Sequence, residues 1–430
     1  MNTKHIDSKI IPALEAAPEI AAFQLHATSN HTVNCGFINN DFGGIYRPII
    51  NSKVERIEFR VMLNDGRSSI GSAPLGTKPD SLITQILVSA HTPAEPIVFA
   101  EKLDNEPDVK LADEAIRKIL EDNPEEVSNL AKELQVQQLK QGHELVEGGV
   151  KLISQQRRIV SSTGVDIIES TTRQSMFAYY EDRLGVGLDE RALFGIDRLE
   201  AHSGAISNCM KQLSGVPAKL KNGKYPILLD SGEGWRLLDK FVLGNLDGDT
   251  VDAEQSHFRL DDFKKSLPIA HSNFNLHYNQ RKPMSTESFN FSSQGTPSQE
   301  FTLIKDGKLT EPICNLKIGK KLGYKAKALS TLMTDTVKQK SYADFVQDNE
   351  TFILIFGVMG VHTAKTAQGN YSLPAPDALL IKNGKVVGPL SCVISGNFFD
   401  VLMQTSTQFI DASHMFDSPA LSFETQVTVK

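Results

Sequence analysis

The sequence contains few cysteines, and none of them forms a recognisable pair. Four cysteines lie far apart along 430 residues, with no C-x-x-C spacing. They are Cys35, Cys209, Cys314 and Cys392. This scarcity excludes a disulfide scaffold, a zinc ribbon and a redox dithiol. We interpret the four as buried thiols in a protein of a reducing compartment.

An excess of positive charge is also missing. The chain has 45 Lys and Arg against 52 Asp and Glu, which gives a net charge of −7, and it contains no long block of basic residues. A dedicated nucleic-acid binder derives most of its affinity from neutralising phosphates, and it therefore needs a basic surface. We expect no nucleic-acid partner.

Long apolar runs are absent as well. The longest, from Ile353 to Val361, has about half of the roughly 20 residues that cross a bilayer. Within residues 1–25, charges and the prolines Pro12 and Pro18 interrupt the apolar segment that a secretory signal needs. We therefore predict a cytoplasmic protein that does not associate with a membrane.

The composition that remains is that of a globular protein. Hydrophobic residues make up 40% of the chain and charged residues 23%, and the length allows two large domains or three small ones. Between Ile57 and Leu63 apolar and polar residues alternate, and Asn64-Asp65-Gly66 follows. This pattern predicts a half-buried strand that enters a hairpin.

Apolar residues then recur at helical spacing, over residues 111–120 and 127–134. This spacing predicts two amphipathic helices. Asn123 and Pro124 are typical of the start of the second helix, which we expect to end at Gly148-Gly149.

Strand and turn signals dominate the second half of the chain. Three dipeptides fit tight hairpin turns, and they are Asn222-Gly223, Asp306-Gly307 and Asn383-Gly384. The last two lie in near-identical contexts, LIKDGK and LIKNGK, which we interpret as one hairpin used twice rather than as a true repeat. One helix is expected from Glu233 to Leu243.

These signals together predict an α+β protein of two domains. Residues 1–205 are expected to form an N-terminal α/β domain with a mixed sheet and amphipathic helices. Residues 215–430 are expected to form a C-terminal β-rich domain of antiparallel hairpins. The boundary is predicted in the polar, glycine-containing stretch from His202 to Gly215.

Residue chemistry alone identifies no active site. The only His-Glu pair is His143-Glu144, with Glu147 one helical turn further on, an arrangement that would suit a hydrolytic metal centre. Because it lies at the end of a charged helical pattern, we favour solvated side chains instead. His257, His271 and His277 are likewise interpreted as surface histidines. No phosphate-binding loop, dinucleotide fingerprint or nucleophile elbow occurs in the sequence.

Two segments of the C-terminal half carry a resemblance to a known family. They are LLDKFVLGNLDGD, from Leu237 to Asp249, and SSQGTPSQEFTLIKDGKL, from Ser292 to Leu309. They resemble the TldD/PmbA family, in which a helix bearing His-Glu-x-x-x-His is followed by a turn and a hairpin. Further short matches occur in the family's order at Lys320–Gly323, Gly369–Ser372, Leu379–Leu390, Ile394–Asn397 and Ser418–Leu421.

The resemblance breaks down at the metal ligands. Aligned on the flanking residues, the His-Glu-x-x-x-His motif falls on Asp239, Lys240 and Gly244. The third ligand of the family is a Cys before the final strand, but the region Gln408–Ser418 contains His414 and no Cys. A zinc site needs three protein ligands. The chain therefore resembles the PmbA/TldE branch, which lacks them, and we expect no metal and no other cofactor.

The resemblance implies a non-catalytic subunit, inactive alone, of a metalloprotease assembly that acts on unfolded or modified peptides. Its partner would be a metal-bearing TldD-like subunit or a second copy of itself. Two alternatives remain open. One is a stand-alone peptide-binding homodimer, and the other is a metallopeptidase whose metal site is rebuilt from Asp239, His414 or the three histidines named above.

The turn motifs of the resemblance are candidates for contact with a peptide substrate. They are Gly295, Thr296, Gly369, Asn370 and Tyr371. The other interpretation, that hairpin geometry alone demands these turns, is favoured. Trp235, the only tryptophan, is expected to anchor the core or an interface.

Overall fold

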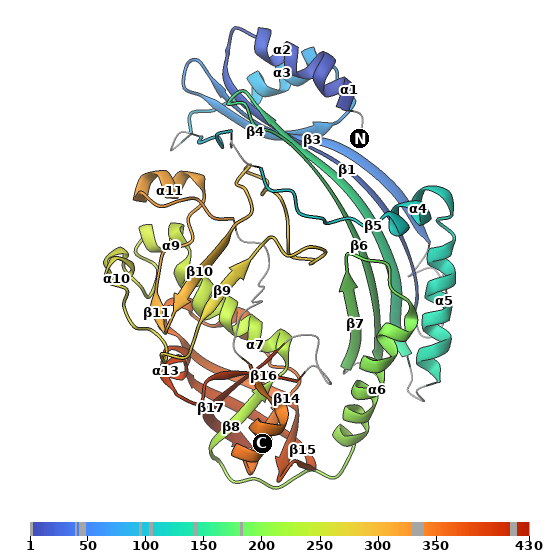
Figure 1. Cartoon of the computed structure of the whole chain (residues 1–430), viewed down its shortest axis with the longest axis vertical. Coiled ribbons are helices and arrows are strands. Elements are labelled where there is room, and N and C mark those ends of the chain that lie inside the picture. Colours follow the sequence, from blue (N-terminus) through green and yellow to red (C-terminus); the bar gives the residue numbers. More distant parts are fainter. Residues whose placement is uncertain are drawn as a thin grey trace. The chain divides into compact units, whose positions relative to one another are not determined.

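Figure 1 shows a computed structural model of the chain. The structure describes residues 3–38, 41–42, 49–93, 97–102, 106–140, 145–180, 184–328, 339–412 and 419–429.

Contacts within the chain divide it into two compact units. Unit 1 comprises Met1–Ile196, Gln280–Gln299 and Asn315–Ala328. Unit 2 comprises Asp197–Asn279, Glu300–Cys314 and Leu329–Lys430. The chain therefore returns to unit 1 twice after it has entered unit 2.

Unit 1 is built on one antiparallel sheet of seven strands with the order β4-β3-β1-β5-β6-β7, in which β2 pairs with β1. The strands are β1 (Ile20–Ile38), β2 (Asp41–Phe42), β3 (Ile50–Leu63), β4 (Ser68–Pro74), β5 (Leu145–Ser161), β6 (Asp166–Tyr180) and β7 (Leu184–Glu190). Because the strands are long, separate groups of helices pack at different places along the sheet (Figure 1).

Two groups of helices cover this sheet. The helices of unit 1 are α1 (Thr3–His5), η1 (Ile6–Ile10), α2 (Ile11–Ala16), α3 (Pro79–Ser89), α4 (Glu114–Asp122), α5 (Glu126–Leu139) and α11 (Leu316–Leu322). The N-terminal group buries Ile10, Leu14 and Ile86 against β1 and β3 in one apolar cluster. Helix α5 packs on β1 and β5 through the buried residues Val127 and Leu134.

Unit 2 contains a mixed sheet that closes on itself. Strand β8 pairs with β13 on one side and with β17 on the other, and β17 continues through β15 and β14 back to β13. The strands of this sheet are β8 (Gly223–Leu229), β12 (Gln339–Ser341), β13 (Thr351–Ile355), β14 (Asn370–Lys382), β15 (Lys385–Asn397), β16 (Gln408–Asp411) and β17 (Ala420–Val429). A smaller sheet holds β9 (Leu276–Asn279), β10 (Glu300–Lys305) and β11 (Lys308–Leu309).

One long helical segment packs into the core of unit 2. It runs without a break through α7 (Ser231–Leu238), the π-helical turn η2 (Asp239–Leu243) and α8 (Gly244–Leu246), and it buries Leu237, Phe241 and Leu246. The shorter helices are α9 (Gly248–Asp252), α10 (Leu260–Lys264), α12 (Tyr342–Asp348), η3 (Val361–Thr363), η4 (Thr366–Gln368) and α13 (Phe398–Met403). Helix α6 (Ile196–Leu213) begins at the junction of the two units.

The α+β class and the β-rich C-terminal region are confirmed. Asp306-Gly307 and Asn383-Gly384 both adopt positive φ at their two residues and close the hairpins β10–β11 and β14–β15, so LIKDGK and LIKNGK are the same hairpin used twice. The helix expected over Glu233–Leu243 is also found, within Ser231–Leu246.

Several sequence expectations differ from the structure. Asn222-Gly223 forms no hairpin, because β8 begins at Gly223 and no described strand precedes it there. The second amphipathic helix ends at Leu139, and Gly148-Gly149 lies inside β5. Parallel pairing, expected in the N-terminal sheet, occurs between described strands only in unit 2, at β12–β16 and β8–β13.

The predicted boundary region is helical rather than a loop. The stretch from His202 to Gly215 is the C-terminal part of α6 up to Leu213, and the division between the units falls at Ile196. Whether residues 1–205 and 215–430 fold as separate domains stays a prediction. None of the helices in the described residues combines the length and the apolar character that a bilayer-spanning helix requires.

Candidate functional site

The three residues that the sequence aligns with the family's metal ligands, Asp239, Lys240 and Gly244, lie on the core helix of unit 2. The helix starts at an N-cap, where the Asp230 carboxylate accepts a hydrogen bond of 2.9 Å from Gly232 N. Asp239 and Lys240 begin the π-helical turn, and Gly244 follows directly after it. Single π-helical turns often occur at functional sites because the extra residue widens the turn and redirects side chains.

The Lys240 side chain is engaged by a backbone group. Lys240 Nζ donates a hydrogen bond of 3.3 Å to the carbonyl oxygen of His362. Burial raises the pKa of the Asp239 carboxyl, and the charge of Lys240 opposes that shift. A cation in this position repels a metal ion, and its ammonium group has no lone pair with which to bind one.

The space beside Gly244 is already occupied. A Cβ atom at this residue would lie 2.9 Å from Cγ2 of Thr366. The next side chain, Asn245, is fully buried and donates through Nδ2 to the carbonyl oxygens of Phe241 at 2.8 Å and Thr366 at 3.0 Å. A ligand side chain at position 244 would therefore require the Thr366 side chain to move aside.

A buried polar network holds His257 beside the same helix. Asn245 Oδ1 accepts a hydrogen bond of 2.7 Å from His257 N, and Ser256 Oγ donates to Asn245 O at 2.7 Å. The His257 ring stacks on Phe399 with 3.8 Å between centroids, and its Nδ1 lies 3.0 Å from the carbonyl oxygen of Ala367. This histidine is therefore fixed by local contacts.

The other predicted ligands are spread over separate local contacts. His277 lies 2.9 Å from Thr302 Oγ1 and 3.1 Å from Glu300 Oε1, and His271 Nδ1 accepts from Asn273 N at 3.4 Å. His143, Glu144 and His414 lie outside the described residues. Glu147 is part of strand β5, so the helical spacing assumed for it is wrong. Within the described ranges, no three His, Cys, Asp or Glu side chains are grouped to hold a metal ion.

The predicted substrate-contact residues of unit 2 lie where the chain enters β14, with Gly369 in the turn before it and Asn370 and Tyr371 as its first residues. Gly369 has φ +69°, where a Cβ atom would lie 2.6 Å from Phe399 Cδ2. Asn370 Oδ1 accepts from Asn397 Nδ2 at 2.9 Å. Tyr371 is buried, and its hydroxyl lies 2.7 Å from Thr425 Oγ1. These contacts suit a turn that hairpin geometry demands, and a role in substrate binding stays a prediction.

Gly295 and Thr296 belong to unit 1 instead. Gly295 has φ +82° and approaches Ala100, where an added Cβ would lie 2.9 Å from Ala100 Cβ. Ser292 holds the turn, since its Oγ accepts from Thr296 N at 3.1 Å and its own N donates to Thr296 O at 2.8 Å. Thr296 is buried at 4% exposure, so its side chain is a packing residue.

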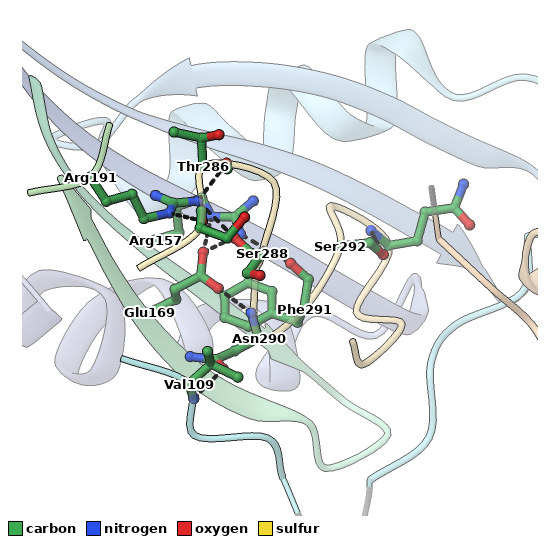
Figure 2. Close-up of polar contacts among 11 residues, drawn as sticks. Val109, Arg157, Glu169, Arg191, Thr286, Ser288, Asn290, Phe291 and Ser292 are labelled. Atoms are coloured by element: carbon green, nitrogen blue, oxygen red, sulfur yellow. Dashed lines mark hydrogen bonds and ion pairs between the residues drawn. The ribbon is translucent and has the colours of Figure 1, made fainter. Parts of the chain in front are cut away.

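A buried ion pair anchors the segment that leads into this turn (Figure 2). Glu169 on β6 has a fully buried side chain, and it pairs with Arg157 on β5, whose Nε donates to Oε1 at 2.9 Å. The second carboxylate oxygen accepts from the backbone N of Asn290. Arg157 also donates to the carbonyl oxygen of Phe291 at 3.0 Å and lies 5.0 Å from the centre of its ring.

A second arginine holds the same segment by its backbone. Arg191 donates from Nε to Ser285 O at 2.6 Å, and from Nη2 to Thr286 O at 2.9 Å and Ser288 O at 2.7 Å (Figure 2). Burial lowers the pKa of Arg191, and the Glu169 charge opposes this shift. The three carbonyl oxygens supply the hydrogen bonds that a desolvated guanidinium requires.

The sequence interpretation missed this cluster. Arg157 and Glu169 are cross-strand neighbours, each six residues from Thr163 in the turn between β5 and β6. This symmetric spacing about a turn could have predicted from the sequence that the two residues pair. Their burial could not be predicted, because the residues that cover them lie more than a hundred positions further along the chain.

The comparisons with known proteins agree with this fold. Residues 222–427 match the family model of the PmbA/TldA metallopeptidase C-terminal domain. No curated protein sequence is significantly similar to the chain.

Similar solved structures cover nearly the whole chain. TldE from Thermococcus kodakarensis is 15% identical, with a TM-score of 0.76 over 97% of this chain and 98% of that one. Two proposed modulators of DNA gyrase are each 17% identical. The one from Bacteroides thetaiotaomicron has a TM-score of 0.76 over 100% of this chain and 99% of that one, and the one from Thermotoga maritima has 0.74 over 95% and 96%.

At these identities the solved structures establish the fold, and the family model establishes the kinship of the C-terminal part. The TldD/PmbA resemblance read from the sequence is thereby confirmed. Residues 222–427 are a C-terminal domain of the PmbA/TldD metallopeptidase family, in a chain that has the fold of TldE throughout.

Proposed function

We propose that the chain is a non-catalytic subunit that assembles with a metal-bearing TldD-like subunit into a peptidase acting on unfolded or modified peptides. It would act in the cytoplasm, where the partner supplies the metal and the hydrolytic chemistry. In this assembly the chain itself would bind peptide and help to close the cavity in which the partner cleaves it. Neither a metal nor another cofactor is required in its own fold.

The observation that carries this proposal is the construction of the core helix at Asp239, Lys240 and Gly244. A cation stands at the position aligned with the general base, and the Thr366 side chain packs against Gly244 at the position aligned with a histidine. The residues at these positions make other contacts, since Lys240 bonds to the His362 carbonyl and the neighbouring Asn245 is buried and bonded to Thr366. The chain matches the fold of TldE over 97% of its length but lacks the family's catalytic residues, and this combination supports a role in binding or assembly.

The test combines the chain with a TldD-like homologue that carries His-Glu-x-x-x-His, ideally one encoded beside it. We expect no peptide cleavage by the chain alone and a gain of cleavage on mixing, together with a complex in light scattering. A matched control is the homologue with its Glu changed to Gln, which should still form the complex but should cleave nothing. No complex and no gain of activity would contradict the proposal.

Elemental analysis separates the alternative of a rebuilt metal site. We expect zinc well below one equivalent per chain after dialysis, because the described residues present no set of three ligands. About one tightly bound zinc per chain would support a metallopeptidase instead. A peptide-binding homodimer would be indicated by peptide binding without any gain of activity on mixing.

A further inference from the structure

Among the described residues, one edge of the unit 1 sheet is left without a paired strand along part of its length. Strand β4 pairs with β3 from Met62 to Arg56, and its last contact is the hydrogen bond of 3.2 Å from Leu75 N to Glu55 O. The first residues of β3, Ile50–Val54, pair with β1 on their inner side. No strand in the described part of the chain pairs with their outer side.

The backbone of this edge presents hydrogen-bonding groups outward. Leu63 N and Glu55 O both bond toward the β4 side of β3, and the register along β3 has no shift between residues 50 and 62. In a strand, the direction of the N–H and C=O groups alternates with a period of two. Lys53 and Asn51 therefore direct their N–H and C=O groups away from β1, where a further strand would pair.

The two faces of the edge differ in character. Ile50 and Val54 are 46% and 55% exposed and lie on one face of the sheet. Lys53 and Asn51, at the alternate positions, lie on the opposite face. Edge strands are commonly protected by a lysine, but here the opposite face of the same segment presents two exposed β-branched residues, Ile50 and Val54, which favour pairing with another strand.

On the Lys53 face the edge opens into a polar groove of about 690 Å³. Its floor consists of cross-strand rows, in which Lys53 is opposite His31 and Ser29 is opposite Gln156. Arg117 of α4 lies on the facing wall. Apolar residues on either side along β1, Ala27 and Val33, are buried, so the groove is a polar interruption in a covered sheet face.

We infer that the outer edge of β3 from Ile50 to Glu55, together with this groove, binds an extended peptide as an added strand. The peptide backbone pairs with Lys53 and Asn51, which is the β-augmentation mode of recognition. Its alternate side chains cover Ile50 and Val54 on one face and enter the polar groove on the other. The ligand is therefore an extended segment in which apolar and polar residues alternate.

This inference rests on the proposed function, since it names a site at which the peptide would be held. The probe is a fluorescein-labelled heptapeptide of alternating Val and Ser, whose binding to the full chain is followed by fluorescence anisotropy. A second peptide has the same sequence but carries N-methyl groups at alternate residues. These groups remove the peptide N–H donors that would pair with β3, and they leave the side chains unchanged. We expect about tenfold weaker binding of the methylated peptide, because several backbone hydrogen bonds are lost.

Two substitutions of Lys53 test the site on the protein side. Lys53→Pro removes an N–H that points away from β1, so it leaves the β1–β3 ladder intact and should weaken binding about tenfold. Lys53→Ala keeps the backbone and should change binding by less than about threefold. The double variant Ile50→Ser, Val54→Ser alters only exposed side chains, so it should fold and should also weaken binding.

The outcomes separate this inference from the proposed function. Equal binding of both peptides, or unchanged binding by Lys53→Pro, would overturn the edge site. An absence of saturable binding up to about 1 mM protein would also overturn it, because even weak strand pairing should be detected at that concentration. If mixing with the metal-bearing homologue still generated activity, the proposed function would stand without this site. Peptide capture at the edge with no activity in the mixture would support the edge site and contradict the proposed function.

Discussion

Each of the two carboxylate oxygens of the buried Glu169 side chain accepts a hydrogen bond from a donor. Arg157 donates to one oxygen, and the backbone N of Asn290 donates to the other. Replacing one member of a buried ion pair leaves the other charge desolvated and unpaired, which costs about 3 to 5 kcal/mol. We therefore expect Glu169→Gln to lower the free energy of unfolding by about 3 kcal/mol, measured by urea denaturation.

The matched control for this substitution is Asp189→Asn on β7 of the same sheet. Asp189 pairs with Arg173, and the side chains are 40% and 41% exposed. Exposed pairs contribute about 1 kcal/mol or less. A similar loss of stability in the two variants would show that the burial of Glu169 does not increase its contribution to the free energy of unfolding.

His26 on β1 gives unit 1 a dependence on pH. Burial is the largest cause that lowers its pKa, the charge of Arg157 adds to the effect, and Glu58 opposes it from 3.4 Å. The unfolded chain takes up this proton near the ordinary pKa of about 6.5, whereas the folded chain takes it up only at lower pH. Stability should therefore be full above about pH 7 and should fall as the pH drops below about 6.5.

The variant His26→Gln removes this titration. Its urea midpoint should decline less than that of the wild-type chain between about pH 7.5 and pH 5.5. An equal decline in both proteins would assign the pH dependence to other groups.

At the scale of elements, the two related hairpins respond differently to the same change. A Cβ atom at Gly307 would lie 2.2 Å from Ala270 O, a backbone atom that cannot easily move. At Gly384 it would lie 3.0 Å from Cγ1 of Val346, a side chain that can rotate. The two glycines have φ of +73° and +71°, a conformation that costs an L-residue about 1 to 2 kcal/mol.

We expect Gly384→Ala to cost about 1 kcal/mol, from the backbone conformation alone. Gly307→Ala should cost about 3 kcal/mol or more, because the steric clash adds to that strain. Thermal unfolding of the two single variants checks this order. Equal losses would mean that the backbone around Ala270 yields at little cost.

At the scale of the whole molecule, unit 1 depends on residues that follow much later in the chain. Residues 280–299 supply every carbonyl bound by Arg191 and the N–H bound by Glu169. A fragment of residues 1–205 would lose these hydrogen bonds and the segment that covers the two charges, although Glu169 would keep Arg157. We expect it to unfold at a clearly lower urea concentration than the full chain, as followed by far-ultraviolet circular dichroism.

A synthetic peptide of residues 280–299 provides the complementary experiment. Added to the fragment, it should raise the urea midpoint in proportion to the logarithm of its concentration. The same peptide with Asn290 replaced by Pro lacks the N–H for Glu169 and should stabilise less. A fragment as stable as the full chain would support an independent N-terminal domain.

Association is the remaining property of the whole molecule. We expect a dimer, of the chain with itself when isolated and with the metal-bearing homologue when both are present. A stable interface of this kind buries about 2,000 Å² or more. Trp235 stacks on Phe409 at 5.3 Å and packs against the core, so Trp235→Ala should weaken folding as well as any interface. A monomer in light scattering at micromolar concentration would contradict the expectation for the isolated chain.

Features that depend on residue chemistry or on short-range geometry follow from the sequence alone. A lysine and a glycine cannot ligate zinc in any fold, so the identities of Lys240 and Gly244 are informative without knowledge of the packing around them. Asp306-Gly307 and Asn383-Gly384 form turns because two adjacent residues with positive φ satisfy a local requirement. The order of short motifs is likewise enough to place the C-terminal part in its family.

Tertiary contacts, by contrast, decide where the backbone needs space and which charges lose water. Gly148 has the character of a helix end, but it lies in β5, where the Phe37 ring packs so close that an added Cβ would be 2.2 Å from it. Asn222-Gly223 has the composition of a hairpin turn but lacks a preceding described strand to pair. The Arg157–Glu169 pair becomes a buried anchor because residues 285–291 cover it, and burial depends on contacts between distant parts of the chain.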